Sequence, residues 1–201
     1  MMKYIYKAID FLKSPEKSFD SIKGEKLGEA FKFMLVVAIV FAVLNGIVSG
    51  LIANFFSTGF GMTGAVLLPV VIVGAIVGGY IGIIIFLTIW GLWLHLWAYV
   101  FGARKGLEQT MKSVYYGYSP AYLLGWLPVI SIIFGIWALV LQWMGIRKLH
   151  GMTGGSAALA LIIAIVIPVI IAAVAFMTLL AAFLPMTGIG TLGGLSGLGV
   201  T

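Results

Sequence analysis

The sequence predicts an all-α fold: a polytopic integral membrane helical bundle with five transmembrane segments. Hydrophobic residues make up 62% of the 201 residues and charged residues only 9%, whereas soluble domains average about 25% charged residues. Apolar runs long enough to cross a bilayer recur along the chain. The 12 Lys and Arg residues fall into three clusters that these runs separate.

The distribution of positive charge predicts how the chain is oriented. The clusters lie in residues 1–32, at 104–112 and at 147–148. Short loops rich in Lys and Arg stay in the cytoplasm. We therefore expect a multi-pass protein of the cell membrane with its N-terminus inside and its C-terminus outside.

The net charge of +6 has a topological explanation. Basic residues at the cytoplasmic face are attracted to anionic lipid headgroups, so no nucleic-acid partner is inferred. The chain has no cysteine. This excludes disulfides, thiolate catalysis and Cys-ligated metals.

Residues 1–32 are expected to form a cytoplasmic amphipathic lead-in. Apolar residues recur at three- and four-residue spacing, which predicts a helix over 2–13: Met2, Ile5, Ile9 and Leu12. Ser14 and Pro15 are typical of the start of a second short helix, which would end at Gly24. The two helices either lie in the membrane surface or pack under the spans, because amphipathicity fits both.

Residues 33–184 are expected to form the membrane domain. The first span runs from Phe33 to Phe56 and contains Asn45 and a pair of glycines, Gly46 and Gly50, in a GxxxG arrangement. Such residues favour close packing and hydrogen bonding between helices. The uncharged loop 57–65 would be external.

Residues 66–101 contain no charge and are predicted to form one long second span. Two spans here would place Arg104 and Lys105 outside. The aromatic residues near its end are expected at the cytoplasmic interface: Trp90, Trp93, Trp97 and Tyr99. The glycines at four-residue spacing suggest a close helix contact: Gly74, Gly78 and Gly82.

The segment 112–145 has two interpretations. Residues 112–126, broken at Pro120, and residues 129–145 form either two spans or a re-entrant hairpin, and both return the chain to the cytoplasm at Arg147. Pro120 is expected in the bundle interior, because irregular backbone at membrane depth must be buried in protein or line a cavity.

The last span is expected over 157–184, with Pro168 as a kink. The Gly-rich tail, 185–201, would be external.

The scarcity of acidic residues argues against ion-coupled transport. After residue 29 the chain has no Asp or Glu except Glu108. Ion-coupled transporters and proton pumps usually need ionisable groups at membrane depth. No catalytic, cofactor-binding or metal-binding residue is assigned, no cofactor is expected, and the protein is not expected to be an enzyme.

Two sets of residues are nonetheless candidates for contacts. Candidate cavity or partner residues are Asn45, His95, Tyr115, Tyr118, Ser119, Pro120 and Tyr122. Candidate lipid-headgroup contacts are Arg104, Lys105, Arg147, Lys148 and His150. Other membrane proteins, or a second copy of the chain, are further candidate partners.

Two alternative functions remain open from these residues. One is a lipid or small-molecule transporter or channel with a path near Pro120. The other, more remote, is an intramembrane hydrolase. Residues 117–121 nearly match the GxSxG nucleophile motif, with His95 or His150 as a base for Ser119. Pro120 would remove a backbone N–H that the oxyanion hole needs.

Four features in order resemble the Ypt-interacting-protein (Yip-one) domain family in its short prokaryotic form. They are FLKSPEKSF at 11–19, His95 late in the second apolar run, YYGYSPAYLLGW at 115–126, and RKLHG at 147–151 before an Ala-rich span. The likeness covers about residues 8–184.

This resemblance implies five spans, a cytoplasmic N-terminus and an external or lumenal C-terminus. Eukaryotic members act in vesicle trafficking, bind prenylated Rab GTPases and one another, and are not enzymes. This chain lacks their Asp-Leu-Tyr-Gly-Pro motif and their long N-terminal domain, so Rab binding is not carried over. The first hypothesis is a non-enzymatic protein that organises membrane or partners through its helices and basic cytoplasmic face.

Overall fold

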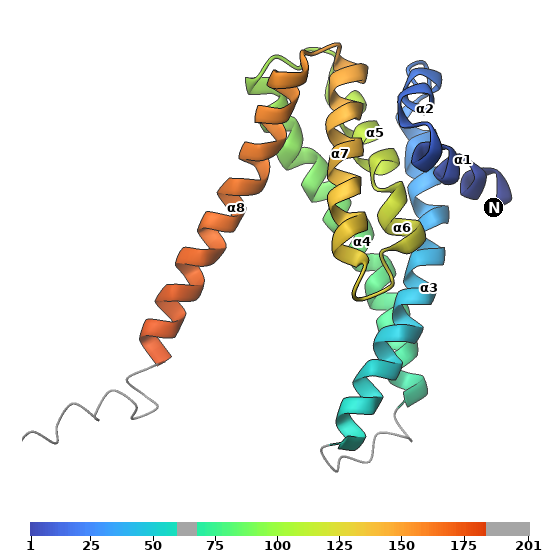
Figure 1. Cartoon of the computed structure of the whole chain (residues 1–201), viewed down its shortest axis with the longest axis vertical. Helices are drawn as coiled ribbons and strands as arrows, with labels where there is room; N and C mark the ends of the chain where they lie inside the picture. Colours follow the sequence, from blue (N-terminus) through green and yellow to red (C-terminus); the bar gives the residue numbers. More distant parts are fainter. Residues whose placement is uncertain (60–67, 184–201) are drawn as a thin grey trace, which may run out of the picture. The chain divides into compact units, whose positions relative to one another are not determined.

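The computed structural model describes residues 1–59 and 68–183, and these residues fold entirely as helices and short connections. Figure 1 shows the chain from α1 to α8. In order, the helices are α1 (Met2–Lys13), α2 (Pro15–Ser21), α3 (Leu27–Gly59), α4 (Leu68–Val100), α5 (Leu107–Gly117), α6 (Ser119–Leu124), α7 (Ser131–His150) and α8 (Gly154–Phe183). The expected tail, 185–201, lies outside the described residues.

The chain divides into two compact units, Met1–Leu161 and Ile162–Thr201. The first contains α1 to α7 and the start of α8. The described part of the second is the remainder of α8, which carries Pro168 inside the helix. From Pro168 onward the side chains of α8 are exposed, as lipid-facing side chains of a spanning helix would be.

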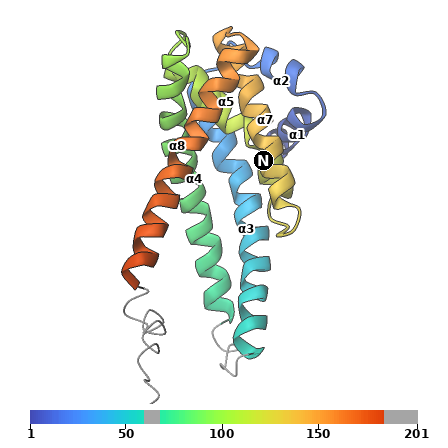
Figure 2. The same ribbon diagram turned by 60° about the vertical axis from the view of Figure 1, so that its left-hand side comes forward.

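Helices α3 and α4 form an antiparallel pair, which Figures 1 and 2 both show side by side. A Cβ on Gly46 would lie 2.8 Å from the backbone nitrogen of Ile76, and one on Gly50 would collide with Cγ1 of Ile72. Only glycine allows the helices to approach this closely. The predicted packing role of these two glycines is confirmed.

The second glycine prediction is wrong within this chain. A Cβ added to Gly74, Gly78 or Gly82 would meet no atom within 4 Å. The close face of α4 is instead the one that carries Ile72 and Ile76. Regular spacing identified a face of α4, but it could not show which face meets α3.

Helices α5 and α6 lie at the centre of the first unit. From Thr110 to Gly117 every residue is buried, and Ser119 to Tyr122 are buried as well. The helical course breaks at Tyr118, and Pro120 lies in the first turn of α6, where a missing N–H breaks no helical hydrogen bond. The expected position of Pro120 in the interior is confirmed.

Within residues 1–59 and 68–183, four helices are long and apolar enough to cross a membrane: Leu27–Ser57 within α3, α4, α7 and α8. The continuous α4 agrees with the single long span expected over 66–101. The segment expected as a span over 112–126 is divided between the shorter α5 and α6. The five-span count and the sidedness remain predictions.

Candidate functional site: the basic end of the bundle

The N-terminal helices α1 and α2 pack into the bundle through aromatic side chains. Phe11 stacks on Tyr116 of α5 at 5.0 Å between ring centroids and meets Phe19 of α2 edge-on at 4.8 Å. Phe11, Phe19 and Ile22 are completely buried. The lead-in helices therefore pack on the bundle, and their position relative to the membrane surface remains a prediction.

A polar cluster joins α1, α5 and the connection between α2 and α3. Lys7 Nζ lies 2.5 Å from Glu25 Oε1, and the Tyr116 hydroxyl donates to Glu25 Oε2 at 2.6 Å. The Lys7 ammonium also lies 4.6 Å from the centre of the Tyr116 ring. Burial raises the pKa of Glu25, but the hydrogen bonds from Lys7 and Tyr116 outweigh it, and the pKa lies below its usual range. Glu25 is therefore a carboxylate that fastens α1 to the bundle.

Lys112 of α5 is a buried cation. Its side chain is 1% exposed, and its ammonium donates to the carbonyl oxygens of Lys23 at 3.2 Å and Glu25 at 2.8 Å. Glu108 lies 3.8 Å away as a partly exposed counter-charge. The buried Lys112 ammonium thus holds the backbone of the connection between α2 and α3.

The end of α7 is fastened to α2 by ion pairs. Arg147 Nη2 lies 3.0 Å from Glu16 Oε1, and Lys148 Nζ lies 2.7 Å from Asp20 Oδ2. The hydrogen bond from Lys148, with a second from Lys23, lowers the pKa of Asp20 from 3.8 to about 2. Two of the candidate headgroup contacts, Arg147 and Lys148, therefore have carboxylate partners within the protein.

A relay of three side chains joins α4, α5 and α7. Thr110 Oγ1 lies 2.8 Å from His95 Nδ1 and 2.9 Å from His150 Nε2. A hydroxyl has one proton, so when both rings are neutral Thr110 donates to one histidine and accepts from the other. His150 is only 6% exposed, and its Nδ1 has no partner among the described residues. His150 is thus a packed interior residue at the end of α7.

No group of three or more His, Cys, Asp or Glu side chains that could hold a metal ion occurs in residues 1–59 and 68–183.

The remaining two headgroup candidates lie in the connection between α4 and α5. Arg104 is exposed, donates to the carbonyl of Tyr99 and stacks on its ring at 4.2 Å. Lys105 is exposed, and its ammonium approaches Gly151 at the end of α7. Both cations are available at the surface of this end of the bundle.

The N-terminal segment carries exposed lysines that make no ion pair within the described part of the chain, among them Lys13, Lys17 and Lys26. Lys23 and Lys32 are exposed too, but they pair with Asp20 at 2.7 Å and Glu29 at 3.0 Å. The basic end therefore carries exposed lysines that are paired with nearby carboxylates and exposed lysines that are not.

The tyrosines around Pro120 have different surroundings. Tyr115 lies 3.4 Å from the Thr88 hydroxyl of α4. Tyr118 is partly exposed and meets the fully buried Tyr122 edge-on at 5.1 Å. The Tyr122 hydroxyl is buried without a partner in the described residues. Tyr115 and Tyr122 also meet Phe31 and Phe33 of α3, at 6.0 and 6.4 Å between ring centroids.

The two residues of the hydrolase hypothesis, Ser119 and His95, each form a hydrogen bond with a different partner. The Ser119 hydroxyl is buried and donates to the Tyr116 carbonyl at 2.5 Å, while His95 bonds to Thr110. Each group thus has a partner other than the one a Ser–His pair would need. Asn45, expected to bond to another helix, accepts from Ser49 of its own helix at 3.3 Å.

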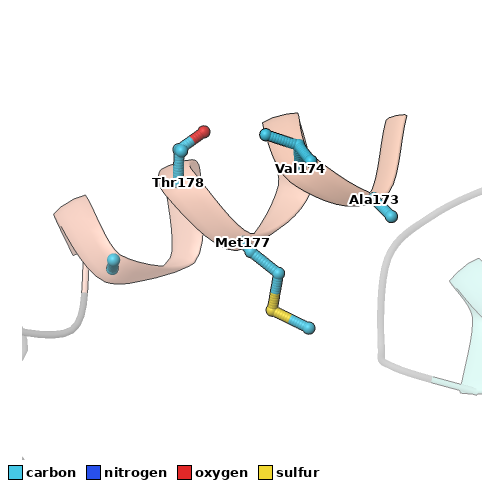
Figure 3. A pocket seen from close by; sticks show the side chains of 5 residues that line it. Ala173, Val174, Met177 and Thr178 are labelled. Atoms are coloured by element: carbon cyan, nitrogen blue, oxygen red, sulfur yellow. The ribbon is translucent and has the colours of Figure 1, made fainter. Parts of the chain in front are cut away.

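The hollows on the described surface include the following two. One, of about 390 Å³, lies between α1 and α7 and is lined by Leu12, Ile133, Phe134, Ile136 and Trp137. The other follows the end of α8, where Figure 3 shows side chains of one helix projecting from different sides. Both are open at the surface and neither includes a residue of the site, unlike a binding cavity that surrounds its ligand.

Several residues that build this end were not singled out from the sequence. Thr110, Lys112 and Tyr116 carry its polar contacts, and the Trp90 indole donates to Gln142 Oε1 at 2.7 Å between α4 and α7. The one feature of the sequence that could have indicated these residues is the polar composition of α5, which lies between two apolar runs.

Comparison with known proteins identifies the family. No curated protein and no solved structure matches the chain. The model of the Yip1 domain matches residues 9–177, a range that begins in α1 and ends in α8. The match therefore includes the packed N-terminal helices as well as the long apolar ones, and the chain belongs to the Yip1 domain family.

Proposed function

We propose that this protein is a non-enzymatic multi-pass membrane protein that organises anionic lipid at its basic end. The observation that carries the proposal is the exposure of Lys13, Lys17 and Lys26 without ion pairs, among the described residues, on a segment fixed to the bundle. Buried Phe11 and Phe19 hold that segment in place. Fixed cations bind headgroups at a lower entropic cost than cations on a free tail.

The orientation belongs to this proposal. With the N-terminus in the cytoplasm and the C-terminus outside, α3, α4 and α8 cross the bilayer. The segment from α5 to α7 starts on the basic side of the membrane and ends on the same side. This keeps the sidedness expected for the family but gives three complete crossings in place of the five that the resemblance implies. The basic residues support it, because each of them lies at the same end of the α3–α4 pair.

The expected strength of headgroup binding follows from surface electrostatics. Each lysine near an anionic membrane surface contributes about 1 kcal/mol. Three such lysines would give a clear preference for anionic lipid, and salt would weaken it because the contacts are exposed to solvent. Arg104 and Lys105 could add to the same field.

The test compares lipids retained by purified protein. The triple variant K13Q/K17Q/K26Q is extracted from membranes, and its bound anionic and zwitterionic lipids are measured by mass spectrometry. We expect the variant to lose most of the wild-type preference for anionic lipid, and we expect wild-type protein in high salt to behave in the same way.

The control is the double variant K23Q/K32Q, which removes exposed lysines that already have carboxylate partners. It should keep the lipid preference. If the triple variant keeps the preference while remaining folded, the lysines do not organise anionic lipid and the proposal is wrong.

One observation favours the transport alternative. The Tyr122 hydroxyl, on the same short helix as Pro120, is buried without a described partner, and such a group is costly unless water or a solute meets it. A path would then pass between α3 and α6. Flux of small solutes from proteoliposomes, reduced by Tyr122→Phe, would support this function, and sealed vesicles would exclude it.

A further inference from the structure

The first unit has very different cross-sections at its two ends. Near the basic end, α3 contacts α1, α5 and α6, and α7 contacts α2, α5 and α6. Between Ala42 and Ser57 the buried residues of α3 are Gly46 and Gly50, which lie against Ile76 and Ile72 of α4. Figures 1 and 2 both show the α3–α4 pair continuing past the other helices of this unit. The unit is therefore broad at the basic end and narrow at the other.

Side-chain contacts place the turn between α6 and α7 along this pair. Trp90 of α4 donates a hydrogen bond to Gln142 of α7, so these two residues lie at the same height along the axis of the α3–α4 pair. Helix α7 runs parallel to α4 and begins at Ser131, about 17 Å before Gln142 at 1.5 Å per residue. The start of α7 therefore lies near the level of Gly79 on α4.

A residue of α3 can be placed at the same height as Gly79 of α4. Gly46 lies against Ile76, so Gly79 is level with about Val43, in the antiparallel helix. Val43 is about 15 Å from Phe33 and about 20 Å from Phe56 along the helix axis. These residues bound the apolar part of α3, so the turn lies near its middle. A hydrocarbon core about 30 Å thick would contain the turn at half depth.

The turn, residues 125–130, has the composition of a segment that meets lipid. It carries no charge, and the side chains at and after it are strongly exposed: Val129 by 86%, Ile132 by 70% and Ile133 by 63%. A turn in water would expose this apolar cluster at a large cost in free energy. Acyl chains are the environment that removes this cost.

Several polar groups of the turn are paired locally. Leu127 N–H donates to Leu124 O at 3.3 Å, Ser131 N–H donates to Leu127 O at 2.9 Å, and the Ser131 hydroxyl donates to Pro128 O at 2.8 Å. Pro128 itself has no N–H to satisfy. The Trp126 indole donates to Leu123 O at 2.8 Å. A turn at membrane depth requires such internal pairing.

We propose that α6 and α7 form a re-entrant hairpin that enters only the leaflet next to the basic end, and that the resulting wedge favours membranes in which this leaflet is expanded. The hairpin adds helical volume to one leaflet and none to the other. Insertion into one leaflet is sensitive to curvature because it is relieved where that leaflet is stretched. With the orientation proposed above, the protein would favour membranes that bulge toward the cytoplasm.

The first experiment measures the depth of the turn. The chain has no cysteine, so single cysteines can be labelled with a membrane-impermeant maleimide in sealed vesicles. We expect Lys17→Cys to react from one side and Ser57→Cys from the other. Val129→Cys and Ile132→Cys should react from neither side until detergent is added. Reaction of both from the same side as Ser57→Cys would show a complete crossing and overturn the hairpin.

The second experiment measures the curvature preference. Giant vesicles with the protein in both orientations are labelled from outside at Lys17→Cys or at Ser57→Cys, so that each dye marks one orientation. Tubes are then pulled outward. Molecules labelled at Lys17→Cys should be enriched in the tube relative to the vesicle, increasingly so as the tube narrows. Those labelled at Ser57→Cys should be depleted.

Equal partition of the two labels would overturn the wedge. This outcome is independent of the lipid proposal, because the vesicles can be made of zwitterionic lipid alone. Loss of anionic-lipid preference in K13Q/K17Q/K26Q with an unchanged curvature preference would show two separate properties.

Discussion

Asp20 of α2 and Lys148 of α7 are 128 residues apart in the sequence, yet the carboxylate oxygen and the ammonium nitrogen lie 2.7 Å apart. The same ammonium donates to the Glu16 carbonyl at 3.1 Å. Lys148 therefore holds both the backbone and a side chain of α2. This fixes the N-terminal segment, with its unpaired lysines, at the end of α7.

The first prediction concerns the pH dependence of this contact. The pKa of Asp20 is lowered from 3.8 to about 2 by Lys148 and Lys23. A depressed folded-state pKa gives stability that is present above the unfolded pKa and is lost as the pH falls through the folded one. Asp20→Asn should lower the Tm at pH 7, and the difference from wild type should disappear between pH 3.8 and about 2.

Thermal unfolding in detergent checks this prediction. Asp10→Asn is the matched control, because Asp10 is exposed and makes no ion pair in the described part of the chain. A difference for Asp20→Asn that persists unchanged at pH 2 would mean that the ion pair with Lys148 is not its cause.

The second prediction concerns the relay of His95, Thr110 and His150. Thr110→Val keeps the shape of the side chain but removes the hydroxyl that both rings contact at 2.8 and 2.9 Å. Unsatisfied buried polar groups cost about 1–3 kcal/mol. We expect the variant to be destabilised by an amount in that range, measured by chemical unfolding. Thr110→Ser keeps the hydroxyl and should retain most of the stability; equal losses would instead indicate a packing effect.

The third prediction compares two glycines of the long helices. Gly46→Ala would place a Cβ 2.8 Å from the Ile76 backbone, whereas Gly78→Ala would meet no atom within 4 Å. Overpacking typically costs about 1–3 kcal/mol, so Gly46→Ala should lower the Tm and Gly78→Ala should not. A Tm lowered by Gly78→Ala would show that this face of α4 packs against another molecule in the membrane.

The fourth prediction concerns Tyr122. Its hydroxyl is buried without a described partner, and burying such a group costs about 1–3 kcal/mol. Tyr122→Phe should therefore leave the free energy of unfolding unchanged or raise it. A clear loss of stability would mean that water or a solute bonds to the hydroxyl, in support of a path near Pro120.

The local elements could be predicted from the sequence because they depend on neighbouring residues. Amphipathic spacing located α1, and the uncharged run 66–101 located α4 as one helix. Pro120 correctly indicated an interior break. The contact at Gly46 and Gly50 was also predicted, since small residues at four-residue spacing allow close approach.

The candidate site could be predicted less well, because it joins distant segments. Arg147, Lys148 and His150 were all expected to contact lipid headgroups, but Arg147 and Lys148 pair with α2, while His150 bonds to Thr110. Lys112 belongs to the basic cluster at 104–112, yet its side chain is only 1% exposed. The charge and hydropathy of a segment describe that segment alone. They do not indicate which carboxylate or carbonyl of another segment will lie opposite one of its cations.

The sequence by itself determined that the chain is helical and apolar enough for a membrane, because helix formation and transfer into lipid depend on local composition. It also determined that the cations lie in clusters between the apolar runs. Only the tertiary structure decided which cations stay exposed, since that depends on acids and carbonyls brought from other helices. It also decided how far α6 and α7 extend along α3 and α4. That depth follows from side-chain contacts such as Trp90 with Gln142, which no single segment contains.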